Sequence, residues 1–244
     1  SFRLTDASSY FSGMNISQAK TLDPLSHLYD VSVFPRPLMR NIFNDNRFRK
    51  MYMAHLKTIM EENFSNLSYL DSANKMHQII DQSVNLDSNK FYSYLDFQNN
   101  IDSTVTNTIN YPGIKDLMSN RMNYLSNYSG YNHNIAIDSI KEYNNTLSIG
   151  DDLWITANII DADQVVLFYR FKSSGAFQET LMLDNGNNND GAIGDFKYGA
   201  KIPNIGNNTQ YFIYAENDSA GQFSPERAAY EFYEYYAPIQ GGDL

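Results

Sequence analysis

The sequence contains no cysteine. This absence excludes disulfides, zinc sites with thiolate ligands and thiol nucleophiles. Long apolar runs are also missing, since none approaches the roughly 18 to 20 residues of a membrane-spanning helix. The first residues, SFRLTDASSYF, lack the basic, apolar and small-residue regions of a secretory signal peptide. We therefore expect no membrane span in this sequence, and we expect the chain to be a fragment or a mature product.

Motifs for phosphate binding and nucleophilic catalysis are missing as well. There is no GxGxxG, Walker-type or GxSxG run. The histidines are isolated from one another: His27, His55, His77 and His133. A zinc site built from three of them is a minor alternative. Neighbouring carboxylates such as Asp151 and Asp152 point different ways and do not form an acid/base dyad. The sequence thus predicts no catalytic and no cofactor-binding residue, and we expect the chain not to be catalytic by itself.

Positive charge is scarce in the second half. The net charge of the 244 residues is −10. Residues 1–133 hold 12 Lys and Arg against 12 Asp and Glu, whereas residues 134–244 hold 6 against 16. Nucleic acid is therefore not an expected partner, and a cation or a neutral surface fits the second half better. The charged fraction of 19% and the 19 tyrosines are typical of secreted or cell-surface bacterial proteins.

The best-defined helix is predicted over residues 44–64, NDNRFRKMYMAHLKTIMEENF. Its apolar side chains share one helical face: Phe48, Tyr52, Leu56, Ile59, Met60 and Phe64. Asp45 or the residue before it can cap the helix. Arg47, Arg49 and Lys50 crowd the positive end of the helix dipole. We expect neighbouring elements to supply partners for these charges, with an anion site as the alternative.

Apolar residues recur at helical spacing through the rest of the first half. Further helices are expected over residues 38–43, 71–86, 94–108 and 114–128. Pro37 suits the first turn of the earliest one. We therefore predict an N-terminal all-α helical segment over residues 1–130.

The spacing of apolar residues changes to two after the SGYNHN run at residues 129–134. About seven strands are expected. Apolar residues at 135–140 and 147–149 open this region, followed by strands at 153–160, 164–170, 177–183, 196–202, 210–215 and 228–236. Residues 153–160 and 164–170 are expected to pair across a turn. We predict a C-terminal all-β sandwich of the immunoglobulin or fibronectin-III type over residues 135–240. Trp154 is expected to anchor its core, with a ligand-stacking role as the alternative.

One stretch, DNGNNNDGAIGD at residues 184–195, has the character of a cation site. Hard cations take six to eight oxygen ligands, and a glycine-rich turn can gather short side chains and carbonyls around one ion. The candidate calcium ligands are Asp184, Asn188, Asp190 and Asp195. The alternative is a long hairpin loop whose Asn, Asp and Gly residues supply turns.

Several ordered blocks resemble a known family. PLMRNIFNDNRFRKMYMAHLKTIMEENFSN, SYLDSANKMHQIIDQSV, DSNKFYSYLDFQNNI and PGIKDLMSNRMNYL resemble the C-terminal helical part of the spore coat protein H (CotH) kinase-like family, in its Bacteroidetes surface form. DDLWITANIIDADQVVLFYR, MLDNGNNNDGAIGD, YGAKIP and YFIYAENDSAGQFSPERAAYEF are similar to the Ig-like module that often follows such domains.

The resemblance implies a secreted or displayed protein with an atypical protein-kinase-like fold. Its nucleotide-binding lobe and its aspartate-containing metal motif would precede the helical part, and nothing in residues 1–35 matches them. ATP and magnesium are therefore expected only in the parent protein. The implied function is that of a non-catalytic C-terminal portion, whose helices complete the kinase-like lobe and whose sandwich acts as a spacer or adhesion module. The expected partner is the upstream lobe.

A different class of function is a stand-alone surface module that binds glycan or protein. Exposed aromatic residues of one strand would carry this binding: Tyr230, Phe232, Tyr233, Tyr235 and Tyr236. A metal-dependent enzyme is a third and weaker alternative.

Overall fold

The computed structural model describes residues 19–25, 37–106, 110–143, 149–171, 173–203, 205–206 and 208–237. Contacts divide the chain into two compact units. We call Ser1–Asn44 with Ile59–Tyr128 the helical unit, and Asp45–Thr58 with Ser129–Leu244 the sandwich unit. No described helix is long and apolar enough to cross a membrane.

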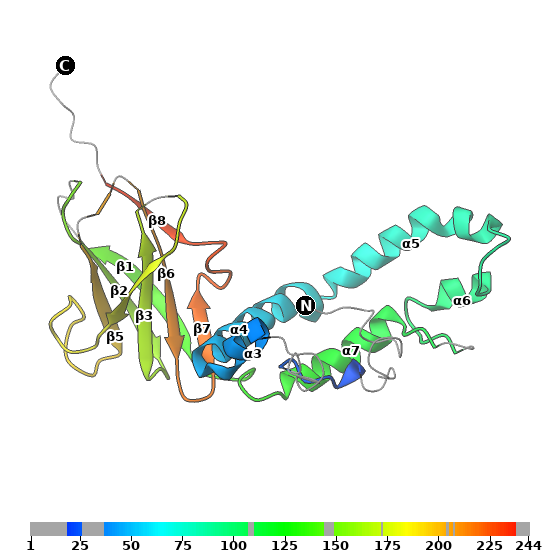
Figure 1. Ribbon diagram of the computed structural model, residues 1–244, viewed down its shortest axis with the longest axis horizontal. Coiled ribbons are helices and arrows are strands. Elements are labelled where there is room, and N and C mark those ends of the chain that lie inside the picture. Colours follow the sequence, from blue (N-terminus) through cyan, green and yellow to red (C-terminus); the bar gives the residue numbers. More distant parts are fainter. Residues whose placement is uncertain are drawn as a thin grey trace, which may run out of the picture. The chain divides into compact units, whose positions relative to one another are not determined.

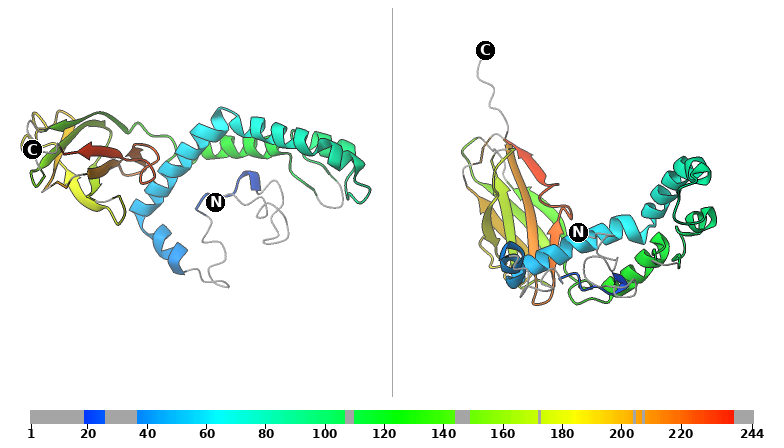
Figure 2. Two further views of the ribbon diagram at one scale, coloured as in Figure 1. Left: turned by 90° about the horizontal axis from the view of Figure 1, so that it is seen from above. Right: turned by 45° about the vertical axis from the view of Figure 1, so that its right-hand side comes forward.

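The sandwich unit contains two antiparallel sheets that share one core (Figure 1 and Figure 2). The first sheet has the order β1-β2-β5, with β1 Ala136–Tyr143, β2 Leu153–Ile160 and β5 Lys197–Ile202. The second has the order β4-β3-β6-β7, with β4 Gln178–Met182, β3 Gln164–Arg170, β6 Asn208–Glu216 and β7 Gly221–Ser224. Strand β8, Tyr233–Tyr236, also pairs with β6.

Alternate residues of the strands fill the core between the sheets. On β2, Leu153, Ile155, Ala157 and Ile159 are fully buried there. On β6, Tyr211, Ile213 and Ala215 face the same core. Successive side chains of a strand point to opposite faces, so the residues between these point away from the core.

A second apolar cluster covers the other face of β6. Helix α4, Asn46–Met60, belongs to the sandwich unit as far as Thr58. Its Ala54 packs in one cluster with Phe212 and Tyr214 of β6. Strand β6 is therefore buried on both faces, which explains its continuous apolar run.

Polar contacts hold this part of α4 to the strands. The carboxylate of Asp45 accepts a hydrogen bond from the Phe48 amide at 3.2 Å and caps the helix. Arg47 forms an ion pair with Glu179 at 2.8 Å. The Lys50 ammonium donates to the carbonyl oxygen of Asn217 at 2.5 Å. The expectation that other elements supply partners is confirmed for Arg47 and Lys50, whereas Arg49 donates to Asn46 of its own helix at 3.3 Å.

The helical unit has few buried apolar residues. Its helices are α3 Pro37–Asn44, α5 Ser68–Leu86, α6 Tyr94–Asn99 and α7 Ile114–Ser126, with a π-helical turn at Glu61–Ser65. Ala19 and Leu117 form a small core cluster, and Lys20 forms an ion pair with Asp116 at 2.9 Å. Neither α5 nor α6 has a buried residue.

The prediction of an N-terminal all-α domain followed by an all-β domain is wrong. The chain is a β-sandwich with helices, because the helix expected to organise the first half packs on a sheet through Asp45–Thr58. The first half is also not purely helical, since Val105 and Tyr111 form an antiparallel bridge. Helical periodicity identified the apolar faces but not which element would cover them.

Three local features differ from what the sequence predicted. Strands β2 and β3 do not pair with each other, because β2 lies between β1 and β5 while β3 lies between β4 and β6. The helix expected over residues 94–108 ends at Asn99. Strand β7 was not predicted. Residues 147–148 of one predicted strand lie outside the described part of the chain.

We expect Ala54→Arg to destabilise the sandwich unit. Ala54 is 6% exposed, and a charged side chain there would be buried or would push α4 off the sheet. The free energy of unfolding should fall by about 2 to 4 kcal/mol in urea titrations followed by circular dichroism. The matched control is Asn46→Ala at the exposed start of α4, which should cost less than about 0.5 kcal/mol. Equal stability of both variants would contradict the helix–sheet packing.

Candidate functional site

The outer face of the β1-β2-β5 sheet carries the only tryptophan. Trp154 lies between Leu153 and Ile155, which are both fully buried in the core. Trp154 itself is partly exposed and belongs to none of the core clusters of the described residues. The alternation of the strand therefore places it on the outer face. The prediction that Trp154 anchors the core is wrong.

Both neighbouring strands place long side chains beside Trp154. In the β-sheet register, Tyr143 of β1 and Lys201 of β5 lie opposite it. The Lys201 ammonium is 5.9 Å from the centre of the Trp154 ring and 2.9 Å from a carboxylate oxygen of Asp152. The outer face thus combines a partly exposed indole with a cation and a carboxylate.

The Tyr143 side chain reaches across the central strand. Its ring centre lies 5.1 Å from the ammonium of Lys197, which is on β5. Strands β1 and β5 flank β2 on opposite sides, so this contact spans β2. Thr156 lies on the same face between Trp154 and Asn158 and is fully buried. The contact between Tyr143 and Lys197 therefore passes over this face of β2.

Positive charge at this face acts on the Tyr143 hydroxyl. Partial burial alone would raise the pKa of Tyr143. The hydroxyl group of Thr156 lowers it, followed by the ammonium groups of Lys197 and Lys141, and the net shift is downward. Lys141 lies opposite Thr156 in the register and so projects from the same face. Lys141, Lys197 and Lys201 therefore project from one face of a protein that is acidic overall.

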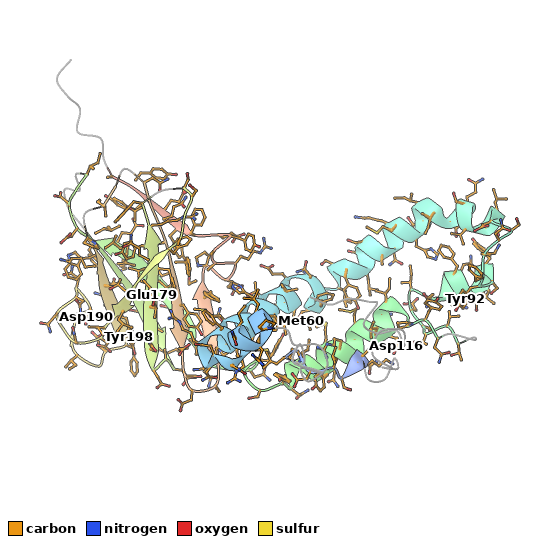
Figure 3. The ribbon with its side chains drawn as sticks, viewed as in Figure 1. Met60, Tyr92, Asp116, Glu179, Asp190 and Tyr198 are labelled. Carbon is orange, nitrogen blue, oxygen red and sulfur yellow. The ribbon has the colours of Figure 1, made fainter. Side chains whose placement is uncertain are left out.

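The predicted calcium loop is organised by Asp190 (Figure 3). Asp190 is fully buried, and its carboxylate accepts hydrogen bonds from the backbone amides of Asn185 at 2.5 Å, Gly186 at 2.9 Å and Asn188 at 2.8 Å. Burial of the carboxyl group raises its pKa, but these backbone hydrogen bonds outweigh burial and lower the pKa of Asp190 below its usual value.

The other predicted ligands also bind backbone amides. The Asp184 carboxylate accepts from two amides, at 2.8 and 2.9 Å, and the Asp195 carboxylate accepts from two more, both at 3.0 Å. The side-chain amide of Asn188 donates to Asn185 at 3.0 Å. Within the described residues, no three His, Asp or Glu side chains gather as metal ligands. The four side chains share one loop, and calcium binding there stays a prediction.

The loop lies against the outer face of the sheet at Gly199. A Cβ atom at Gly199 would be 2.0 Å from the carbonyl oxygen of Asn188, so a side chain cannot fit. Gly199 is opposite Thr156 in the register and hence on the outer face. The loop therefore borders the face that holds Trp154. The sequence alone did not single out Tyr143, Lys141, Lys197 or Lys201. Their alternate spacing along the strands was the signal that could have placed them on one face.

The aromatic set predicted for a binding strand divides between two environments. Tyr233 and Tyr235 pack against the core, so they are not available to a ligand. Phe232 lies against the Arg170 guanidinium at 5.2 Å. Tyr230 and Tyr236 are 93% and 63% exposed. Only part of the set is accessible.

Comparisons with known proteins do not identify the chain. No family model matches it, and no curated protein matches it. A solved structure titled "Crystal structure of Br derivative BhCBM56" is similar over 42% of this chain and 88% of that chain, with 12% sequence identity and a TM-score of 0.26. A TM-score this low supports no conclusion about fold or function.

We expect Asp190→Ala to destabilise the loop even when no metal ion is present. Three backbone amides would lose their acceptor, which should lower the free energy of unfolding by about 1 to 3 kcal/mol in EDTA. Because the folded pKa lies below the unfolded one, Asp190 adds stability above the unfolded pKa of about 4, and this contribution is lost as the pH falls through the lowered folded pKa. Stability of the variant should therefore fall less steeply with acid. The control is Asp218→Ala, at an exposed turn.

The same melts test the calcium prediction. Calcium should raise the melting temperature of the unchanged protein, and Asp190→Ala should abolish the rise. If calcium has no effect while Asp190→Ala is destabilised in EDTA, the loop is held by its own hydrogen bonds. Equal stability of Asp190→Ala and Asp218→Ala would contradict the structural role of Asp190.

Proposed function

We propose that the sandwich unit is a carbohydrate-recognition module of a secreted or surface-displayed protein, and that it binds glycan on the outer face of the β1-β2-β5 sheet. The observation that carries this proposal is the position of Trp154, which lies on the outer face instead of in the core. A large aromatic side chain gains most free energy when it is buried, so a partly exposed one on a sheet suggests a ligand surface.

The chemistry of the face suits a sugar. A sugar ring has an apolar face of C–H groups and a rim of hydroxyls. The indole of Trp154 offers a flat apolar surface. The Asp152 and Lys201 side chains beside it, and Asn158 further along the same face, offer hydrogen-bonding groups. An apolar platform beside a few polar groups is the arrangement that orients such a ligand.

A protein partner fits this face less well. The centres of protein–protein interfaces are depleted in charged residues, and lysine in particular is rare there. Lys141, Lys197 and Lys201 all project from this one face. Their positions favour a ligand whose hydroxyl or acidic groups contact ammonium groups.

We expect Trp154→Ala to weaken glycan binding at least tenfold, which corresponds to about 1.4 kcal/mol of lost stacking. The measurement is retention in affinity gels that contain a panel of polysaccharides, followed by calorimetry on the ligand found. The matched control is Tyr230→Ala, because Tyr230 is the most exposed member of the other aromatic set. A loss of binding in the control but not in Trp154→Ala would move the site to that strand.

The helical unit favours a second proposal, drawn from the CotH resemblance. Helix α5 has no buried residue, and its apolar Met76, Ile79 and Leu86 are 67%, 80% and 74% exposed. An apolar helix face of this kind gains stability when another element covers it. We propose that the chain is the non-catalytic C-terminal portion of a CotH kinase-like protein and that the helical unit completes its kinase-like lobe.

This second proposal predicts a change in hydrogen exchange. Amides of α5 should exchange quickly in the present chain, because α5 has no buried residue, and at least tenfold more slowly in a longer chain that includes a nucleotide-binding lobe. The amides of β6 serve as the internal control and should be protected in both. Unchanged exchange of α5 would contradict the docking. Micromolar binding of ATP with magnesium to the present chain would contradict its non-catalytic role.

A further inference from the structure

Cationic side chains are concentrated at the proposed glycan site. Residues 134–244 contain only six Lys and Arg residues against 16 Asp and Glu. Three of these six, Lys141, Lys197 and Lys201, project from the outer face of the β1-β2-β5 sheet. Half of the positive charges of this region therefore lie on the face that also carries Trp154 and Tyr143.

Two of the three ammonium groups are available for a ligand. Lys201 is engaged by Asp152 at 2.9 Å. For Lys141 and Lys197, the part of the chain that the structure describes places no carboxylate within salt-bridge distance. The Lys197 ammonium lies 5.1 Å from the centre of the Tyr143 ring, and Lys141 projects from the same face two residues before Tyr143 on β1. An anionic group that approaches Tyr143 would therefore meet two ammonium groups that lack such a carboxylate.

We propose that the ligand of this site is an acidic polysaccharide, with one sugar ring stacked on Trp154 and a carboxylate or sulfate group held between Lys141 and Lys197. This inference rests on the proposed glycan binding and specifies its substrate class. Lys197 lies opposite Asn158, four residues along β2 from Trp154, which is about 13 Å in a strand. The ligand must therefore extend beyond a single sugar ring.

A nucleic acid fits these observations less well. Its binding proteins are usually basic and neutralise many phosphates along the backbone. Here the cations are few, and Asp152 and Asp138 lie at or beside the same face in a protein of net charge −10. A short acidic segment of a glycan needs only the few ammonium groups present.

The test compares ligands that share a backbone and differ in charge. Polygalacturonate is paired with its methyl ester, and dextran sulfate with dextran, in titrations with the full chain. The acidic member of at least one pair should bind tenfold or more tightly than its neutral partner. Raising the salt concentration from about 50 to 200 mM should weaken that binding several-fold. Preference within the first or the second pair distinguishes carboxylate from sulfate.

Charge-reversal variants locate the contact. Lys197→Glu and Lys141→Glu should each weaken binding of the acidic polymer at least tenfold. The matched control is Lys75→Glu, which makes the same change in net charge on the exposed surface of α5 and should leave binding within twofold. Melting curves of all three variants confirm that the sandwich remains folded.

The possible outcomes distinguish the acidic-ligand inference from the proposal of glycan binding on which it rests. Equal binding of acidic and neutral partners, with loss only in Trp154→Ala, would overturn the acidic ligand and leave glycan binding in place. Absence of binding to every polysaccharide would overturn both. Tighter binding of polyuridylate, competitive with polygalacturonate, would replace the acidic glycan with single-stranded nucleic acid.

Discussion

The structure of the sandwich unit depends on the burial of β6 from two sides. Tyr211 and Ile213 point into the core between the sheets, while Phe212 and Tyr214 point the other way into a second apolar cluster. A strand with large apolar side chains on both faces is stable in water only if both faces are covered. The β1-β2-β5 sheet and the Asp45–Thr58 part of α4 supply the two covers. That requirement explains why part of α4 belongs with the strands and not with the other helices.

The two sheets consequently have different outer surfaces. Part of helix α4 covers the sheet that contains β6, so the outward aromatic residues of β6 are buried. The outer face of the β1-β2-β5 sheet carries Trp154 and three lysines instead. The loop that Asp190 organises lies against this face at Gly199. One side of the sandwich is thus buried under a helix, and the other is the face on which we propose that a ligand binds.

Much of the fold could be predicted from the sequence, because periodicity and turn residues are local signals. Pro37 begins α3, Asp45 caps α4, and β2 and β3 lie at their expected residues. Long-range pairing could not be predicted: the short turn after Ile160 suggested a hairpin, but the chain crosses between sheets there. The composition of residues 184–195 was enough to identify the loop that borders the outer face. Trp154 was misplaced because strand alternation defines two faces without saying which one is buried.

The central claim is that the single tryptophan belongs to an open outer face and not to the core. Acrylamide quenching of its fluorescence measures this directly, since no other tryptophan contributes to the emission. The account predicts an emission maximum typical of a partly hydrated indole, efficient quenching in the native protein, and protection from quenching when an acidic polysaccharide is bound. Emission typical of an apolar core, with quenching that appears only on unfolding, would contradict it.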